Sequence, residues 1–406
     1  MTGMTRAAMS ARRTSLIGAL LAMLGPISMS IYTPAMPELV RAFLTTPSEV
    51  KLTLSVYFGG FALAQLMAGP FSDAFGRKSA TLAFLGINLA GSLACAFAPD
   101  IDTLIFGRMI QGIGASVGIT VARAIVRDQF TGAEASRIMN LIGIMLAIGP
   151  AMAPALGGLA LAAFGWRSIF FLLMGFSLMT MLAILVYLRE TTVPDRTRAR
   201  PGRLLRAYAE ILRDGRFLAA VGVLGGAIGA LYAQSTMLSF ILIDRVGLSP
   251  TAFGLSMLMQ SGFYFLGSVV LRLTARWTGG ERAVQIGLLA CGLGGVMILA
   301  SVHLLTPSLL SIMVPVAFSA FGIAFLTPHM TTVALQSFPH IAGSASAMLG
   351  FIQMGCGFLG GLAASFVGTP LDAFGAIIPT MLFAAVVSYL AFQAQTRRQV
   401  LDPPAA

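Results

Sequence analysis

The sequence predicts an all-α membrane protein in which twelve transmembrane helices form two halves of six. Three observations support this prediction: the composition, the length of the apolar runs and the placement of the charges. Of the 406 residues, 57% are hydrophobic and only 10% are charged, whereas soluble domains are roughly 45–50% apolar and about 25% charged. A soluble fold of this size could not bury so much apolar surface. The runs are too long, and alternate too little, for a β-barrel.

The apolar runs predict where each helix lies, because each run has about the 20 residues that a spanning helix needs. The first run follows a basic N-terminus, as in a secretory signal peptide. It is long enough to span and no small-residue cleavage site follows it, so we predict that it is retained as a helix. The twelve predicted spans are residues 14–36, 50–71, 79–98, 103–124, 136–160, 166–188, 217–242, 251–271, 284–304, 308–330, 341–367 and 372–394.

The charges predict the orientation. Twelve basic residues lie in the N-terminal tail or in every second gap after it, whereas the opposite gaps hold only Arg41, Lys51, Arg167 and Arg245. Cytoplasmic loops carry the excess of Lys and Arg, so both termini are expected in the cytoplasm. The formal net charge of +11 does not indicate nucleic acid binding, because the basic residues are scattered among short gaps and form no single basic face.

The largest gap divides the chain. Residues 189–216 hold eight arginines and separate an N-terminal bundle (14–188) from a C-terminal bundle (217–395), with tails at 1–13 and 396–406. We interpret the arginines as a solvated anchor of topology. Contact of Arg203 and Arg206 with lipid headgroups is the second interpretation. Glycine positions echo weakly between the halves, as in transporters built from two parallel repeats with a substrate site between them.

A short charged turn lies between the second and third predicted helices. Residues 69–78 read GPFSDAFGRK. Gly69 allows a close approach of backbones and Gly76 permits the turn, while Asp73, Arg77 and Lys78 stand at the membrane boundary. A polar turn that only anchored two helices would need no fixed order of residues. The order G-x-x-x-D-x-x-G-R-K resembles the signature loop of the major facilitator superfamily.

Other stretches narrow the resemblance. Residues 32–37, 65–73, 122–128 and 338–353 are similar to the Bcr/CflA-type, or bicyclomycin-resistance, branch of drug efflux transporters. The run 143–158 resembles the motif of drug–proton antiporters, in which prolines bend the helix and glycines allow close packing. Its gating candidates are Gly149, Pro150, Pro154, Gly157 and Gly158.

The resemblance implies a function. It implies a multi-pass protein of the bacterial inner membrane that exports amphipathic small molecules by alternating access, driven by protons. We expect a monomer with no cofactor. In this superfamily the aspartate of the loop faces the N-terminus of helix eleven, near Gly343 and Ser344 here, and its arginine meets an acid that corresponds to Asp128. We expect this cluster to latch the two halves together when the carrier is open outward.

The sequence departs from the family at one position. Members usually carry an aspartate where this chain has Ser30, and no acid remains in the core of the first six helices. Proton coupling needs a carboxylate that changes its protonation state. The alternative function is therefore a facilitator, or an exporter or importer of one small metabolite, without proton coupling. Without that acid, Arg108 has no evident counter-ion, which favours neutral or zwitterionic substrates over quaternary amines.

Four polar residues within the apolar runs are the candidate substrate-binding residues: Tyr32, Gln65, Arg108 and Gln234. The competing interpretation of each is ordinary helix packing. For Arg108 it is a side chain that extends to the outer interface, because the residue lies only about a turn and a half into its helix. The three histidines are scattered and predict no metal site. Glycine patterns that mimic nucleotide or nucleophile motifs lie inside spans, so no enzyme is expected.

Overall fold

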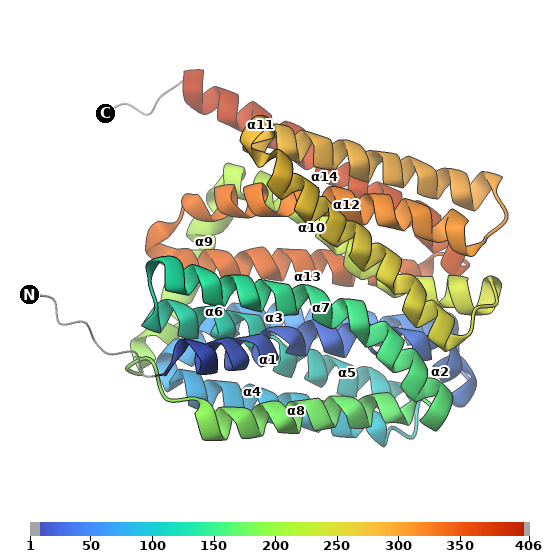
Figure 1. Cartoon of the computed structure of the whole chain (residues 1–406), viewed down its shortest axis with the longest axis horizontal. Helices are drawn as coiled ribbons and strands as arrows, with labels where there is room; N and C mark the ends of the chain where they lie inside the picture. The colour runs from blue at the N-terminus through green and yellow to red at the C-terminus, as the bar shows by residue number, and fades with distance from the viewer. Residues whose placement is uncertain (1–8, 402–406) are drawn as a thin grey trace, which may run out of the picture.

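The computed structural model describes residues 9–401, and the side chains in that range except those of 198, 199 and 398–401. Every regular element in this part of the chain is helical (Figure 1). The N-terminal elements are α1 (Ala11–Ser30), η1 (Thr33–Ala35), α2 (Met36–Ala42), α3 (Pro47–Phe75), α4 (Arg77–Ala96), α5 (Ile101–Ala115), α6 (Val117–Gln129), α7 (Gly132–Phe164) and α8 (Arg167–Tyr187). The remaining elements are η2 (Arg196–Ala199), α9 (Pro201–Arg213), α10 (Gly215–Ser235), η3 (Phe240–Arg245), α11 (Pro250–Leu304), α12 (Leu309–Gln336), η4 (Pro339–Ile341), α13 (Ala342–Phe366) and α14 (Pro370–Leu401).

Eleven helical segments of the described chain are long and apolar enough to cross a membrane. One of them, α11, contains two crossings, because its 55 residues are broken at Gly279 by a non-helical backbone with φ 64° and ψ 177°. The two arms of α11 meet at this break, and both extend from it toward the same end of the molecule (Figure 1). The chain therefore crosses twelve times, and the predicted all-α membrane fold is confirmed.

The segment between the halves is more ordered than its charge predicted. Residues 189–216 were expected to form a solvated loop, but they contain η2 and the 13-residue helix α9. Leu204 and Ile211 of α9 are buried and Tyr208 is partly buried, which places apolar side chains on one face at helical spacing. This amphipathic pattern lies within the run of arginines, and the prediction took account only of the charge.

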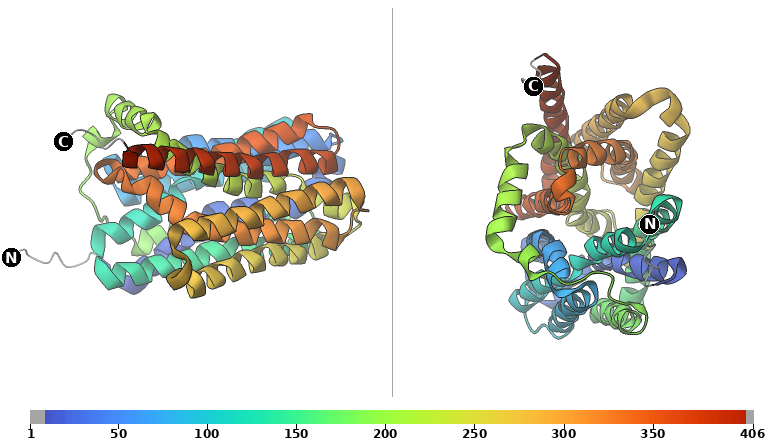
Figure 2. Two further views of the ribbon diagram at one scale, coloured as in Figure 1. Left: turned by 90° about the horizontal axis from the view of Figure 1, so that it is seen from above. Right: turned by 90° about the vertical axis from the view of Figure 1, so that its left-hand side faces the viewer.

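Two hydrophobic clusters build the two halves. The buried members of the first come from residues 9–188, with Phe240 as the single addition. Those of the second come from residues 211–392. The main contacts between the halves pair α3 with α13 and α7 with the first arm of α11. The view along the bundle shows the two groups of helices on either side of this boundary (Figure 2).

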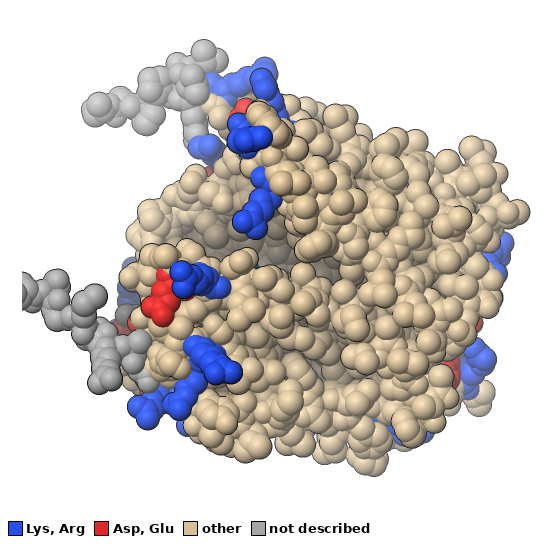
Figure 3. All heavy atoms as spheres, in the orientation of Figure 1, with Lys and Arg blue, Asp and Glu red and all other residues tan. Residues whose placement is uncertain are grey.

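The two ends of the molecule differ. We call the end where α1 begins and α14 ends the termini end, and the opposite one the far end (Figure 1). On the surface that Figure 3 shows, Lys and Arg gather at both ends and leave an uncharged band between them, as a bilayer requires. At the termini end the surface between the halves is hollowed (Figure 3). At the far end the halves touch: a Cβ at Gly158 would lie 2.4 Å from the Pro250 carbonyl, and Arg41 reaches Asp244 at 3.8 Å.

Candidate functional site

The charged turn predicted at residues 69–78 joins α3 to α4 through Gly76. Its φ of 94° lies in the region that favours glycine. A Cβ there would also stand 2.5 Å from Oε2 of Glu190. The backbone conformation therefore favours glycine at this position, and the missing Cβ leaves room for the Glu190 carboxylate.

Arg77 is the centre of this turn. Its side chain is only 3% exposed. Nε donates to Oδ2 of Asp128 over 2.9 Å and Nη1 donates to Oγ of Ser72 over 2.6 Å, while Asp73 contacts the same Nη1. The pairing of Arg77 with Asp128 that the resemblance implied is present. It joins the α3–α4 turn to the end of α6 at the termini end.

Glu190 is a member of this site that the sequence did not identify. It follows α8, and its carboxylate accepts the backbone amides of Arg77 over 2.7 Å and of Lys78 over 3.2 Å. These are unsatisfied donors at the first turn of α4, where the helix dipole favours an anion. The sequence signal is weak: an acid placed just after a span resembles any loop residue.

Asp73 also contacts the segment between the two halves. Its backbone carbonyl accepts the amide of Asp195 over 3.0 Å, which ties the segment between the halves to α3. The start of α13, which the resemblance placed opposite Asp73, is open here: Gly343 is exposed and a Cβ on it would meet no atom within 4 Å. The hollow at this end and the open start of α13 belong to the same conformation.

Arg108 lies in a cage of aromatic and polar groups inside the N-terminal half. It has no exposed surface, and its guanidinium carbon lies 4.4 Å from the ring centre of Tyr32 and 4.5 Å from that of Tyr57. Cation–π contacts of this kind are strengthened by desolvation. Nη1 donates to the Ser28 carbonyl over 3.4 Å and to Oε1 of Gln111. Arg108 therefore does not extend to the outer interface.

Two nitrogen atoms of the Arg108 guanidinium remain available to donate hydrogen bonds. Nε and Nη2 have no hydrogen-bond partner among the described residues, and neither has Oγ of the neighbouring Ser28. A buried donor without an acceptor is unfavourable by about 1–3 kcal/mol, more for a charged group. The absence of an acid at position 30 does not explain these unpaired donors. Helix α1 presents Ser28 to Arg108, whereas Ser30 lies about 200° further round the helix and is half-buried elsewhere.

A chain of hydrogen bonds extends from Arg108 through the N-terminal half. Gln111 donates from Nε2 to Oγ of Ser92 over 2.7 Å, and Ser92 donates to the Asn88 carbonyl over 2.9 Å. Asn88 in turn donates to the Gln111 carbonyl and accepts from Ser177 of α8. These side chains are buried, so the network fixes α4, α5 and α8 around the arginine.

The four candidate substrate-binding residues do not share one pocket. Tyr32 lies against Arg108 in the core, with its hydroxyl 2.6 Å from Oγ1 of Thr53. Gln65 is buried between the halves, where a Cβ on Gly350 of α13 would stand 2.3 Å from its Nε2. Gln234 lies in the C-terminal half and donates to Oε1 of Gln260 over 3.0 Å. Phe58 and Tyr232 meet across the boundary with ring centres 5.5 Å apart.

The glycines and prolines of α7 contact both halves. A Cβ on Gly157 would stand 2.2 Å from the Ile31 carbonyl of the same half. Gly158 packs instead on Pro250, and the Pro154 carbonyl lies 2.4 Å from where Gly254 would carry a Cβ. A Cβ on Gly149 would lie in ordinary van der Waals contact with Met23 and Ile27. Pro150 and Pro154 both lie inside the helix.

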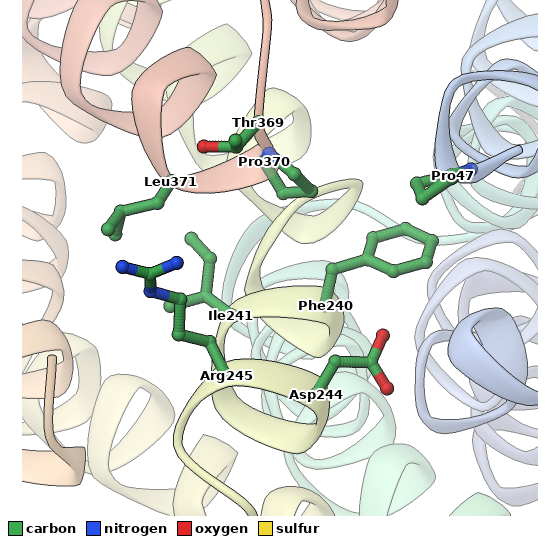
Figure 4. Close-up of a pocket in the computed structure, with 8 residues that line it drawn as sticks. All are labelled: Pro47, Phe240, Ile241, Asp244, Arg245, Thr369, Pro370 and Leu371. Atoms are coloured by element: carbon green, nitrogen blue, oxygen red, sulfur yellow. The ribbon is translucent and has the colours of Figure 1, made fainter.

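A pocket of about 490 Å³ opens at the far end (Figure 4). Phe240 points toward Pro47 of the other half and Asp244 turns to the same side, whereas Arg245 points to the opposite side, toward Leu371 (Figure 4). Burial raises the pKa of Asp244 above its ordinary value, an effect that the nearby Arg41 opposes. No group of three or more metal-binding side chains occurs in the described part of the chain.

Comparison with known proteins identifies the family. The chain matches the Major Facilitator Superfamily over residues 18–361 and belongs to it. It is therefore a secondary transporter that spans the membrane many times, and not an enzyme. It is 30% identical over 387 residues to the uncharacterized MFS-type transporter YdgK of Bacillus subtilis, covering 94% of both chains.

Other relatives are more distant. Multidrug resistance protein D of Escherichia coli is 24% identical over 91% of this chain and 93% of its own. The bicyclomycin resistance protein homolog of Haemophilus influenzae is 25% identical over 94% and 95%. The E. coli xylose transporter XylE, in a partially occluded inward-open conformation, aligns over 94% of this chain and 97% of its own with a TM-score of 0.73 and 13% identity. These proteins align with nearly the whole length of this chain.

Proposed function

We propose that the protein exports small amphipathic molecules across the bacterial inner membrane, with the termini end in the cytoplasm. The observation that supports this most directly is the hollow between the halves, open at the termini end and closed at the far end (Figure 3). With the arginine-rich segments in the cytoplasm, this conformation is open inward. An exporter loads its substrate in that conformation. Relatives that bear multidrug and bicyclomycin resistance names support efflux and the Bcr/CflA-type branch.

The driving force is proposed to be proton antiport. A carboxylate must then bind and release the proton as access alternates, and position 30 offers none. The acids nearest the membrane lie at helix ends: Glu38, Asp73, Asp128, Glu134 and Asp244. Asp73 and Asp128 share Arg77 at the termini end, so a change of charge on either would alter the same cluster. A facilitator without proton coupling is the second candidate, supported by the missing acid.

The substrate is proposed to be neutral or zwitterionic. Arg108 is buried without an acid among its described partners, which are aromatic rings, an amide and a carbonyl. A fixed, uncompensated cation repels a lipophilic cation in the low dielectric of the membrane interior. Its free donors, Nε and Nη2, suit carbonyl or carboxylate oxygens.

The experiment uses the purified protein in vesicles that contain a pH-sensitive dye. With an inward proton gradient and the compound enclosed in the vesicles, we expect protons to enter the lumen as phenicols, sulfonamides or bicyclomycin leave it, and to enter far less when ethidium is enclosed. Movement of these compounds without proton flux would establish the facilitator instead. Equal transport of ethidium and a neutral antibiotic would contradict the role given to Arg108. Empty vesicles and vesicles with an Arg108→Gln variant serve as controls.

A further inference from the structure

Lys51 is a buried cation with no role in the site described above. It is one of only two lysines in the chain, with Lys78. It lies in the second turn of α3 at the far end and has no exposed surface. A charge that merely oriented the helices would stay in water. A buried ammonium must instead be hydrogen-bonded or paired, so its partner indicates its role.

That partner belongs to the other half of the molecule. The Lys51 ammonium donates to the backbone carbonyl of Ala364, two residues before α13 ends at Phe366. The last four carbonyls of a helix have no partner within it and carry a partial negative charge. A cation placed there stabilises the helix end. Lys51 therefore caps α13 across the boundary between the halves.

The contacts between α3 and α13 keep one antiparallel register. Each step toward the termini end along α3 is matched by a nearly equal step back along α13. The pairs that show it are Lys51 with Ala364, Ser55 with Gly361, Gly59 with Phe358, and Gln65 with Gly350. Continued at the same pitch, the register brings Asp73 opposite the first turn of α13, near Gly343. Both helices cover the distance in about 32 Å, at 1.5 Å per residue.

Two charged residues of α3, Lys51 and Asp73, are thus aligned with the two oppositely charged ends of the α13 dipole. Asp73 lies 22 residues after Lys51, and Gly343 lies 21 residues before Ala364. The cation meets the negative C-terminus, whereas the anion is aligned with the positive N-terminus. In this structure the first contact is made, whereas the start of α13 is open around Gly343. The far end is closed and the termini end is open.

We propose that Lys51 is a gating residue that holds the far end closed by capping the C-terminus of α13, and that it is the counterpart of Asp73 at the opposite end. The two contacts alternate: one is made while the other is open. This proposal rests on alternating access, not on the direction of transport or the identity of the substrate.

The test measures the conformation directly. Spin labels are attached at Asp102 and Thr306, exposed positions at the far end of the two halves, after Cys95, Cys291 and Cys356 have been replaced by alanine. Without substrate, Lys51→Met is expected to raise the ratio of far-open to far-closed molecules about tenfold, because a charge-assisted hydrogen bond is lost. Lys51→Gln, which keeps a donor without the charge, should shift the ratio in the same direction by less.

Three further variants make the test specific. Lys51→Arg keeps the cation and should retain most of the far-closed population. Arg167→Gln removes a cation from the same end, but one that stacks on Trp166 of its own half, and should leave the distances unchanged. Lys51→Met combined with Asp73→Asn removes both end contacts and should return the ratio toward that of the native protein. Unchanged distances in both Lys51→Met and Lys51→Gln, or an equal shift in Arg167→Gln, would overturn the proposal.

Discussion

Single residues in this protein hold charge in apolar surroundings by three different means. Arg108 is enclosed by two tyrosine rings and an amide, Lys51 caps a helix end, and Arg77 is paired with two carboxylates. All three side chains join separate helices, but only the first arrangement leaves guanidinium donors without a partner among the described residues. Their partners therefore distinguish a binding role from a gating role better than their burial does.

Glu190 provides a test at this scale. Replacing it with alanine removes the acceptor for two amides at the start of α4, a loss that is typically about 1 kcal/mol for a helix cap. For a chain of 406 residues we expect the apparent melting temperature in detergent to fall by about 1–2 °C. Glu190→Gln, which keeps an acceptor oxygen, should lose less.

The matched control for Glu190 is Asp102→Asn. Asp102 is an exposed acid in the first turn of α5, where Asp100 already caps the helix. The melting temperature of that variant should stay within about 0.5 °C of the native value, since surface changes away from such features have small effects. Equal losses in both variants would show that Glu190 acts only through surface charge.

At the scale of helices, the sequence predicted the membrane crossings well and the contacts between distant helices poorly. The length of the apolar runs was sufficient to predict twelve crossings, because the bilayer sets the length of each span. The order of residues in the α3–α4 turn was sufficient, through resemblance, to pair Arg77 with Asp128. Partners far apart in sequence, such as Lys51 with Ala364 or Arg77 with Glu190, leave no local pattern. Helix α9 was missed because its apolar face is interspersed with arginines.

The glycines of α7 allow a prediction about a whole helix. Gly158 faces the Pro250 backbone of the other half, whereas Gly143, on the termini side of the same helix, has nothing within 4 Å of its Cβ position. Gly158→Leu should force the halves apart at the far end, at a cost of about 1–3 kcal/mol for overpacking. We expect transport to fall about tenfold. Gly143→Leu should transport at close to the native rate, and a similar loss in both would refute this account of α7.

For the whole molecule, the central question is what closes the termini end. The hollow is open there and Asp73 contacts Arg77. On closure, Asp73 is expected to meet the N-terminus of α13, where an anion is stabilised by the helix dipole. Asp73→Asn removes that charge. We expect this variant to be present in the membrane at the native level but to lose transport, measured with the vesicle assay.

The control for Asp73 is Glu281→Gln, which neutralises an exposed acid at the same end of the molecule, just after the break of α11 at Gly279. It should transport at the native rate. Native transport by Asp73→Asn would exclude the latch and leave closure to the apolar contacts between α3 and α13.

The separation of the two hydrophobic clusters has a consequence for how the protein is made. Except for Phe240, the buried members of the first cluster have all been synthesised once residue 188 has been added. The first six crossings can therefore complete their packing while the ribosome is still translating the second six, as is usual for chains that fold domain by domain. The second cluster, whose buried members extend to Phe392, and the boundary, including the contact of Lys51 with Ala364, have to wait for nearly the entire polypeptide. The pairing of α3 with α13, which the proposed gating alters, can therefore form only late in biogenesis.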